Sequence, residues 1–447
     1  MSEKPYEEHE LVELQRLTFD YFRQYSNAEN GLIADTSRQN APSSITAVGL
    51  ALASYPVAVA RGYLTRDEAV ARTLATLRFF WHSPQSTEPD ATGYKGFYYH
   101  FLDMEKGRRH GRSELSTIDT TFLIGGALTA GQYFTHDNDN EREIRELADA
   151  LYRRVDWQWA QNGGRRVSMG WWPESGFHPS RWFGYTEALL LYILGLASPT
   201  YPLPAESYDA WLETYEWQSH YGIESLYAPP IFIHQLSHVW VDFRGIQDAY
   251  MREKCIDYFE NSRRATYIQQ QYAIDNPDNY KGYGEWAWGI TASDGPGEMV
   301  KEVGGVERRF WGYMARGAPG GPDDGTLSPW GVVASLPFAP ELVLPTIAYF
   351  DEHYPFMISD YGFKCSFNPT FPDGEQGWIS QGYYGLDQGP IVLMIENALS
   401  GMIWRLMRRS PYVVTGLRRA GFEGGWLNAA TDVATVRQKD TAENHNE

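Results

Sequence analysis

Apolar side chains recur along most of the chain at the three- and four-residue spacing that places them on one face of an α-helix. In residues 8–25, leucines and aromatic rings follow this spacing, and charged residues lie between them. Residues 184–196 are nearly all apolar, which is typical of a buried helix. The pattern predicts about ten to twelve helices, joined by long loops rich in aromatic residues, Gly and Pro. The other predicted helices cover 45–60, 69–81, 120–134, 141–158, 340–349 and 390–409, and residues 242–273 are expected to form one long helix or two short ones.

Local signals refine some of these helices. Thr65, followed by acidic residues, predicts the N-terminal cap of the helix at 69–81. Pro56 is expected to interrupt the helix at 45–60 near its middle. Strand signals are few, and we expect short hairpins only near 96–101 and 165–170.

The chain shows neither a repeat of fixed period nor a linker rich in Ser and Pro. We therefore predict a single all-α domain over residues 1–430, followed by a polar, frayed tail at 431–447. An (α/α)6 toroid, in which helix pairs form a ring and their loops gather at one end, is the most economical architecture. Periodicity alone does not distinguish it from another helical array.

Composition and charge exclude several classes of protein. The 447 residues carry a net charge of -19, which disfavours a nucleic-acid partner and an anionic membrane surface. With only two cysteines, Cys255 and Cys365, the chain has no disulfide framework and no Cys/His cluster for structural zinc. The N-terminus is acidic where a signal peptide would be basic and then apolar, so we expect a cytoplasmic protein, or a periplasmic or secreted one if a leader was removed.

Aromatic residues make up 15% of the chain, and many of its 16 Trp fall in or beside predicted loops, next to Gly, Pro, Asp and Glu. Flat rings beside carboxylates are suited to stacking on sugar faces while polar groups bond the hydroxyls, so the pattern favours a carbohydrate cleft. The alternative is that the protein covers many of these rings with its own loops. Candidate stacking residues are Trp172, Trp286, Trp288 and Trp378.

Glycoside chemistry requires two carboxylic groups, one acting as an acid and the other as a base or nucleophile. Glu187 is the isolated charge in an otherwise apolar segment, where desolvation should raise its pKa as a general acid requires. The alternative is a buried ion pair with Arg181 or another arginine. Asp119 and Asp387 each stand near the start of a predicted helix, where a capping role is the alternative.

Two further segments carry candidate substrate-binding residues. Glu285 and Asp294 lie in a loop with Tyr283, although Asp-Gly-Pro is also a plain turn signal. Histidines four residues apart at 234 and 238 share a helix face, as zinc ligands do, but position 235 is Gln and no third ligand follows. Hydrogen bonding of sugar hydroxyls is the favoured role for this second segment, and packing is the alternative for one histidine. Its candidates are His238, Trp240, Asp242 and Arg244.

Seven stretches in the same order give the chain a family resemblance over about residues 10–414. The stretches are Gly-Leu-Ile-Ala-Asp at 31–35, Ser-Ser-Ile-Thr-Ala-Val-Gly at 43–49, Gly-Phe-Tyr-Tyr-His-Phe-Leu-Asp at 96–103, Ser-Thr-Ile-Asp-Thr at 116–120, the segment bearing Glu187, residues 234–244, and Gly-Ile-Thr-Ala-Ser-Asp-Gly-Pro at 289–296. Through them the chain resembles the bacterial glucoamylase-like domain family that contains endo-β-1,2-glucanases (glycoside hydrolase family 144) and is related to the cyclisation domain of cyclic β-1,2-glucan synthases.

The resemblance implies an (α/α)6 toroid with a cleft at one mouth and hydrolysis with inversion at the anomeric carbon. It implies that Glu187 is the acid and that Asp387, in the loop before the last long helix, is the base, reaching its water through a substrate hydroxyl. Asp119 would support charge at the reaction centre. We expect no cofactor and no metal, and a neutral β-glucan as partner. Tyr383, beside Asp387, completes the candidate substrate-binding residues.

Three alternatives to a β-1,2-glucan hydrolase stay open at this point. A transglycosylase or an exo-acting, disaccharide-releasing relative would share the fold and the acid. A polysaccharide lyase would need a positive cleft for uronic acids, which the charge of -19 disfavours. A glycan-binding protein without catalytic activity would bind the same sugar and leave it intact.

Overall fold

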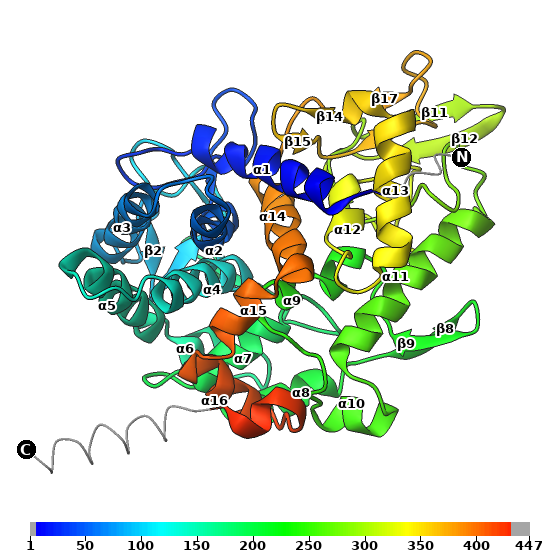
Figure 1. Ribbon diagram of the computed structural model, residues 1–447. Coiled ribbons are helices and arrows are strands. Elements are labelled where there is room, and N and C mark those ends of the chain that lie inside the picture. The colour runs from blue at the N-terminus through cyan, green and yellow to red at the C-terminus, as the bar shows by residue number, and fades with distance from the viewer. Residues whose placement is uncertain (1–5, 431–447) are drawn as a thin grey trace, which may run out of the picture.

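The computed structural model describes residues 6–430, and helices dominate it (Figure 1). The predicted tail at 431–447 lies outside the described residues. The longer helices confirm most of the periodic segments, including the capping box that Thr65 and Glu68 form at the start of α3. The α-helices are α1 (Glu8–Gln24), α2 (Ile45–Arg61), α3 (Arg66–His82), α4 (Thr117–Tyr133), α5 (Asp139–Arg154), α6 (Trp157–Gln161), α7 (Leu189–Ala197), α8 (Ala205–Leu212), α9 (Leu236–Trp240), α10 (Ala249–Lys254), α11 (Tyr258–Asp275), α12 (Pro329–Val333), α13 (Pro340–His353), α14 (Gly385–Leu399), α15 (Met402–Met407) and α16 (Pro411–Arg419).

The strands are short and lie in the connections between helices. The largest sheet is antiparallel, in the order β2-β3-β5-β6-β7, and the others are two-stranded. Three 3-10 helices complete the described elements: η1 (Ile231–His234), η2 (Pro355–Met357) and η3 (Gly425–Ala429). The strands are β1 (Ser43–Ser44), β2 (Gly93–Tyr94), β3 (Phe97–Tyr99), β4 (Phe101–Leu102), β5 (Leu115–Ser116), β6 (Gly170–Trp172), β7 (Gly176–Phe177), β8 (Trp217–His220), β9 (Ile223–Leu226), β10 (Ala292–Ser293), β11 (Met299–Val303), β12 (Val306–Phe310), β13 (Met314–Ala315), β14 (Ile358–Ser359), β15 (Gly362–Phe363), β16 (Phe367–Asn368) and β17 (Trp378–Ile379).

Six inner helices, α2, α4, α7, α9, α12 and α14, are buried over most of their length. Helix α2 packs between α4 and α14, α4 also contacts α7, and α14 contacts both α9 and α12. The Ser237 hydroxyl of α9 bonds the backbone N–H of Leu190 in α7, and the amide of Gln235 bonds the carbonyl of Gly331 in α12. The outer helices, among them α1, α3, α5, α11 and α13, carry exposed residues as well as buried ones.

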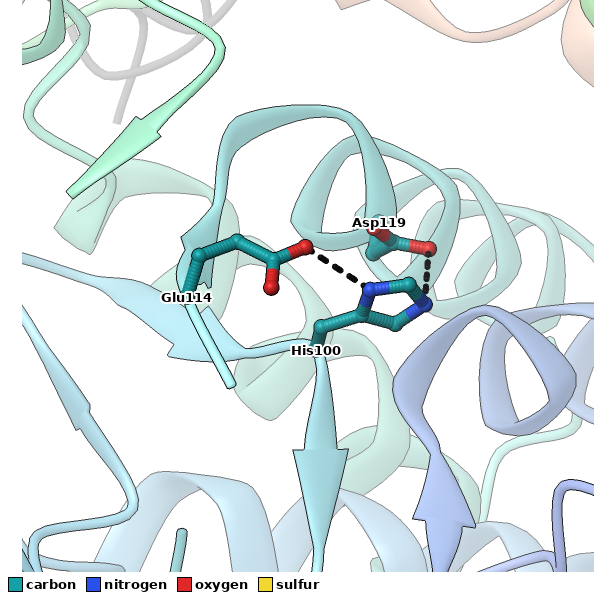
Figure 2. A group of neighbouring side chains, drawn as sticks. All are labelled: His100, Glu114 and Asp119. Atoms are coloured by element: carbon teal, nitrogen blue, oxygen red, sulfur yellow. Dashed lines mark hydrogen bonds and ion pairs between the residues drawn. The ribbon is translucent and has the colours of Figure 1, made fainter. Parts of the chain in front are cut away.

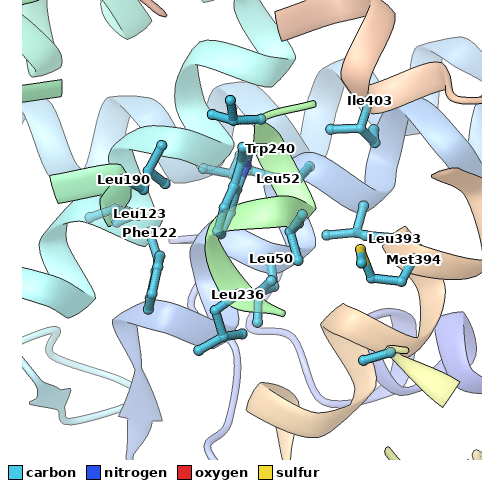
Figure 3. Close-up of a cluster of buried hydrophobic side chains, with 14 of the residues drawn as sticks. Leu50, Leu52, Phe122, Leu123, Leu190, Leu236, Trp240, Leu393, Met394 and Ile403 are labelled. Carbon is cyan, nitrogen blue, oxygen red and sulfur yellow. The ribbon is translucent and has the colours of Figure 1, made fainter. Parts of the chain in front are cut away.

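Apolar side chains from the inner helices meet in one core (Figure 3). The indole of Trp240 lies at its centre and stacks on Phe122, with ring centroids 5.4 Å apart and an interplanar angle of 11°. Leucines from α2, α4, α7 and α9 surround these two rings. Burying such large rings away from water is the main source of stability for this part of the fold.

Glycines allow the backbones of α2 and α4 to approach closely. A Cβ atom built on Gly126 would lie 2.0 Å from the carbonyl oxygen of Gly49, and one built on Gly49 would lie 2.3 Å from the carbonyl oxygen of Phe122. Real Cβ atoms do not come this close to backbone oxygens. Side chains larger than hydrogen at either position would therefore force the two helices apart.

The structure corrects several details of the sequence prediction. Pro56 does not interrupt α2, which continues through this residue to Arg61. Proline removes one backbone hydrogen bond of the helix, and the packing of neighbouring helices against α2 offsets this loss. Glu187 lies in the turn before α7 and not within a helix, while Asp387 lies in the first turn of α14 and not in the preceding loop. Residues 165–169 form no strand, and only Gly170 enters β6. Within residues 6–430, no helix combines the length and apolar character needed to cross a bilayer.

Replacing Gly126 with alanine should lower the free energy of unfolding by about 3 kcal/mol, because overpacking two backbones costs as much as overpacking a core. Gly284 provides the control, since a Cβ atom there would meet no atom within 4 Å. Chemical denaturation of Gly126→Ala and Gly284→Ala measures both effects. Equal stability of the two variants would contradict the close-packing account.

Candidate active site

The inner helices begin around a cavity of about 830 Å³. Its wall includes the first turn of α2, the start of α4, the turn before α7, and the first residues of α9, α12 and α14. Residues from the five-stranded sheet and from the loop before β1 close the remaining sides. The residues that line it include Asp35, Arg38, Thr46, His100, Glu114, Ser116, Asp119, Phe122, Trp172, His178, Trp182, Glu187, Phe232, Trp330, Tyr313 and Tyr384.

Glu187 lies in this wall, and its side chain is partly exposed to the cavity. The Ser237 hydroxyl fixes its backbone by donating a hydrogen bond of 3.0 Å to its carbonyl oxygen. Burial raises the pKa of Glu187 to about 7, a backbone hydrogen bond opposes this rise, and the charge of Asp119 adds to it. The ion pair with Arg181 is not formed, because that guanidinium donates to the carbonyl oxygens of Gln161 (2.6 Å) and its neighbours.

Asp119 lies in the first turn of α4, lines the same cavity as Glu187, and is held on three sides. Thr46 of α2 donates to its Oδ1 at 2.5 Å, Ser116 donates to its Oδ2, and His100 Nε2 lies 3.5 Å from its Oδ1. Ser116 is the N-cap of α4, since its hydroxyl accepts the backbone N–H of Asp119 at 3.1 Å. The carboxylate of Asp119 is therefore oriented toward the cavity, and Ser116, not Asp119, caps the N-terminus of α4.

His100 links Asp119 to a second carboxylate, Glu114 (Figure 2). Its Nδ1 lies 2.8 Å from Glu114 Oε1, and its ring stacks on Phe101 at 3.9 Å. Burial would lower the pKa of His100, but Asp119, Glu114 and Asp35 together raise it to about 9. His100, Glu114 and Asp119 are also a group within residues 6–430 whose ligand atoms lie close enough to share a metal ion, within 4.8 Å of one another.

Asp387 lies behind the cavity wall that Tyr384 and Leu386 form, and its side chain is buried. Within the described part of the chain, neither carboxyl oxygen makes a well-formed hydrogen bond. Burial raises the pKa of Asp387 well above its ordinary value, the neighbouring thiol of Cys365 opposes the rise, and Asp35 and Asp294 add to it. A buried carboxyl group without a fixed partner is available to exchange a proton.

Asp294 is one of the predicted binding residues, and it braces the wall from behind. Its carboxylate pairs with Arg38, which lines the cavity, and accepts a hydrogen bond of 2.9 Å from Ser380. The guanidinium of Arg38 lies 5.7 Å from the ring centroid of Tyr384. The contact between Asp294 and Arg38 joins residues 256 positions apart in the sequence.

Aromatic rings form much of the remaining wall. Trp172 was predicted from the sequence, and it packs beside His178 with ring centroids 5.5 Å apart. Tyr313 lies tilted over Tyr384 at 5.5 Å and has 48% of its surface exposed. A large ring this exposed beside a cavity offers an apolar face to a ligand.

The other predicted binding residues do not line the cavity. His238, Trp240 and Trp288 are fully buried in the core. Asp242 pairs with Arg244 and Arg408. Tyr283 bonds Asp323, and Tyr383 packs against Tyr361. The remaining three, which also lie outside the lining, are Glu285, Trp286 and Trp378.

The histidines at 234 and 238 act as packed, hydrogen-bonded side chains. His234 Nε2 bonds the carbonyl of Ala228 at 3.0 Å, and His238 Nε2 bonds the hydroxyl of Ser262 at 3.0 Å. Burial lowers the pKa of His234 to about 4 and that of His238 to about 3, so both rings are neutral at pH 7.

Sequence reasoning missed many lining residues, among them Asp35, Arg38, His100, Glu114, Tyr313 and Tyr384. His100 offered one signal, since it interrupts a run of aromatic strand residues at 97–101. Asp35 is partly buried in the loop before α2, and burial raises its pKa to about 6, with His100 opposing and Asp119 adding to the rise. The charges of His100 and Asp119 act on Asp35 from other elements of the fold, and no local sequence pattern reveals this.

The raised pKa of Glu187 predicts a pH-dependent stability difference. Below about pH 4.5 the carboxyl group is protonated in both the folded and unfolded states, so Glu187→Gln should be neutral there. Above pH 7 the carboxyl group of Glu187 ionises freely in the unfolded chain, whereas burial disfavours its ionisation in the folded protein. The wild type is therefore destabilised there, and the free energy of unfolding of Glu187→Gln should exceed that of the wild type by up to about 3 kcal/mol. Denaturation at pH 4 and pH 8.5 measures the difference.

The exposed Glu285 provides the control, because Glu285→Gln should change stability by less than about 0.5 kcal/mol at either pH. A Glu187→Gln effect that stays the same at both pH values would show that the pKa of Glu187 is ordinary.

Comparison with known proteins places this site in a family. A family model named Glycoamylase, described as "Putative glucoamylase", matches residues 179–411. The chain is 33% identical to a protein of that description from Bacteroides uniformis, with a TM-score of 0.84, and the match covers 95% of this chain and 100% of that one. An endo-β-1,2-glucanase from Chitinophaga pinensis, solved with sophorotriose and glucose, is 27% identical with a TM-score of 0.80, and the match covers 94% of this chain and 99% of that one.

A curated relative is the exo β-1,2-glucooligosaccharide sophorohydrolase (non-reducing end) of Parabacteroides distasonis, 27% identical over 458 aligned residues. The match covers 93% of this chain, which spans 58% of the length of that relative. The family match spans more than half of the chain and contains Glu187 and Asp387. The chain belongs to the glucoamylase-like (Glycoamylase) family.

Proposed function

We propose that this protein is a glycoside hydrolase that cleaves β-1,2-glucan or its oligosaccharides. The observation that carries the proposal is Glu187, a carboxyl group with a pKa of about 7 in the wall of an aromatic-lined cavity. A general acid works best when its pKa is near the working pH, because it then holds a proton and still releases it readily. Similarity to a β-1,2-glucanase and to a sophorohydrolase supports the choice of linkage.

In the proposed reaction, Glu187 donates its proton to the glycosidic oxygen as the bond to the anomeric carbon breaks. A water molecule attacks that carbon from the opposite face, which inverts its configuration. Asp387, in its ionised form, receives the water's proton through a sugar hydroxyl, as the resemblance to the endo-β-1,2-glucanase family implies. Exchange of protons with solvent then restores both groups.

The substrate is expected to be a neutral glucan. Trp172 and Tyr313 offer ring faces to sugar faces, and Arg38 offers hydrogen-bond donors to hydroxyl oxygens. We also propose that the six inner helices form the inner ring of an (α/α)6 toroid. The packing of α14 against both α12 and α2, which would close such a ring, supports this architecture.

Glu187→Gln and Asp387→Asn should each lower kcat on linear β-1,2-glucan by roughly 10²–10⁴-fold, because each removes one of the two proton transfers. Reducing-sugar release measures the loss. Glu224→Gln is the matched control, since this exposed strand residue lies outside the cavity lining. Near-wild-type rates in either catalytic variant would contradict that residue's assignment.

Product chromatography on β-1,2-, β-1,3- and α-1,4-glucans tests the linkage and the mode of cleavage. A ladder of oligosaccharides from β-1,2-glucan indicates internal cleavage, and release of the disaccharide alone indicates exo action. Longer products would indicate transglycosylation. Cleavage only of another glucan would overturn the proposed linkage, and binding without any product would overturn the catalytic proposal.

A further inference from the structure

We propose that His100 is a positioning residue of the acid: paired with Glu114 and facing Asp119, its imidazolium offsets part of the negative charge of Asp119, which in turn sets how firmly Glu187 holds its proton. This inference rests on the proposed role of Glu187. It assigns a function to the His100–Glu114 pair, which lies in the cavity wall and takes no part in the proton transfers described above.

The geometry supports a clamped, charged ring. Nδ1 of His100 is bonded to Glu114 Oε1 at 2.8 Å, and Nε2 on the opposite edge faces Asp119 Oδ1 at 3.5 Å (Figure 2). A ring with a carboxylate at each nitrogen is best satisfied when both nitrogens carry a proton and donate. Stacking on Phe101, with planes 14° apart, fixes the rotation of the ring.

The groups that face this network come from several elements. Asp35, in the loop before α2, acts on His100 together with Glu114 and Asp119, and all three carboxylates favour the charged ring. His178, after β7, acts on Glu114 and favours its ionised form. The neutral hydroxyls of Thr46 and Ser116 hold the two oxygens of Asp119.

Asp119 and Glu187 line the same cavity, and the charge of Asp119 raises the pKa of Glu187 beyond the effect of burial. Arg38 also lines the cavity, but its guanidinium is paired with Asp294. Among the described residues, His100 is the cation whose ion pair reaches Asp119. The positive charge of His100 therefore reduces the rise in the pKa of Glu187 that the negative charge of Asp119 causes.

The sign of the effect follows from this arrangement. Removing the positive charge leaves Asp119 uncompensated, and the more negative surroundings make Glu187 hold its proton to higher pH. The alkaline limb of the activity profile reports loss of the acid's proton, so it should move to higher pH. Because His100 lies 3.5 Å from Asp119 and both groups line the same cavity as Glu187, a shift of about 0.5 pH unit or more is expected.

The first experiment follows the histidine directly and does not depend on activity. In protein labelled with ¹³C-histidine, the His100 ring signal is the one that His100→Gln removes. It should titrate with a midpoint near pH 9, as its raised pKa requires, and Glu114→Gln should lower that midpoint by about 1 unit or more. A wild-type midpoint near 6.5 would overturn the inference.

The second experiment compares the pH dependence of kcat/KM for wild type, His100→Gln and His100→Lys. The Gln variant should show the alkaline shift, and the Lys variant, which restores a cation, should move the limb back toward wild type. His136→Gln is the matched control, because it removes an exposed histidine that faces Glu141 outside the cavity. Loss of activity with unmoved limbs in a folded His100→Gln variant would show a merely structural role.

The two proposals fail in different ways. If the wild type cleaves no glucan, the proposed function fails, and the side-chain ¹³C titration of Glu187 still tests the coupling: its midpoint should rise in His100→Gln. If glucan is cleaved but the Glu187 midpoint is the same in both proteins, the proposed function stands and the role of His100 is wrong. Should His100→Gln not fold, the wild-type and Glu114→Gln histidine titrations decide.

Discussion

The close approach of α2 and α4 at Gly49 and Gly126 is the constraint on which the rest of the site depends. Because no side chain separates the two backbones, the first turns of both helices lie side by side, and Thr46 of α2 reaches Asp119 of α4. That hydrogen bond joins residues 73 positions apart and orients the carboxylate of Asp119 in the cavity that Glu187 also lines. A wider spacing between these helices would leave Asp119 free to turn toward solvent.

Electrostatics in the cavity follow from crowding carboxyl groups where water is scarce. Asp35 and Glu187 have raised pKa values because burial disfavours their charge, and Asp119 adds repulsion to both. His100 lies between Asp119 and Glu114, and its positive charge offsets part of the repulsion among these carboxyl groups. Such shifts are costly to stability and are typical of sites selected for proton transfer.

Sequence patterns predicted the elements well where periodicity was strong. The helices at α1, α3 and α5 followed from amphipathic spacing and caps, because these local signals act over three or four residues. Glu187 was recognisable as an isolated charge among apolar residues. Trp172 was recognisable from its loop context, and its place in the cavity lining agrees with that reading.

What the sequence could not predict depends on long-range packing. Trp240 lies between His238 and Asp242 in the chain, and Trp288 lies three residues after Glu285, yet both rings turn into the core. His100 and Asp35 acquire their roles only when three separate segments meet, as does the pairing of Arg38 with Asp294. The turn that carries Glu187 could not be predicted, because a continuous apolar segment does not show at which residue its helix begins.

The direction of the inner helices has a consequence for how this fold can diversify. Each of the six begins at the cavity, so the connections that enter them are long, such as 83–116, 213–235 and 354–384, and they carry wall residues or lie beside them. The connections that leave them at the other end are brief, such as 62–65, 134–138 and 334–339. Insertions and substitutions in the long connections can reshape the entrance while the glycine contact and the core stay intact. Related chains can therefore differ in whether they cleave a glucan internally or at its end while keeping the same six inner helices.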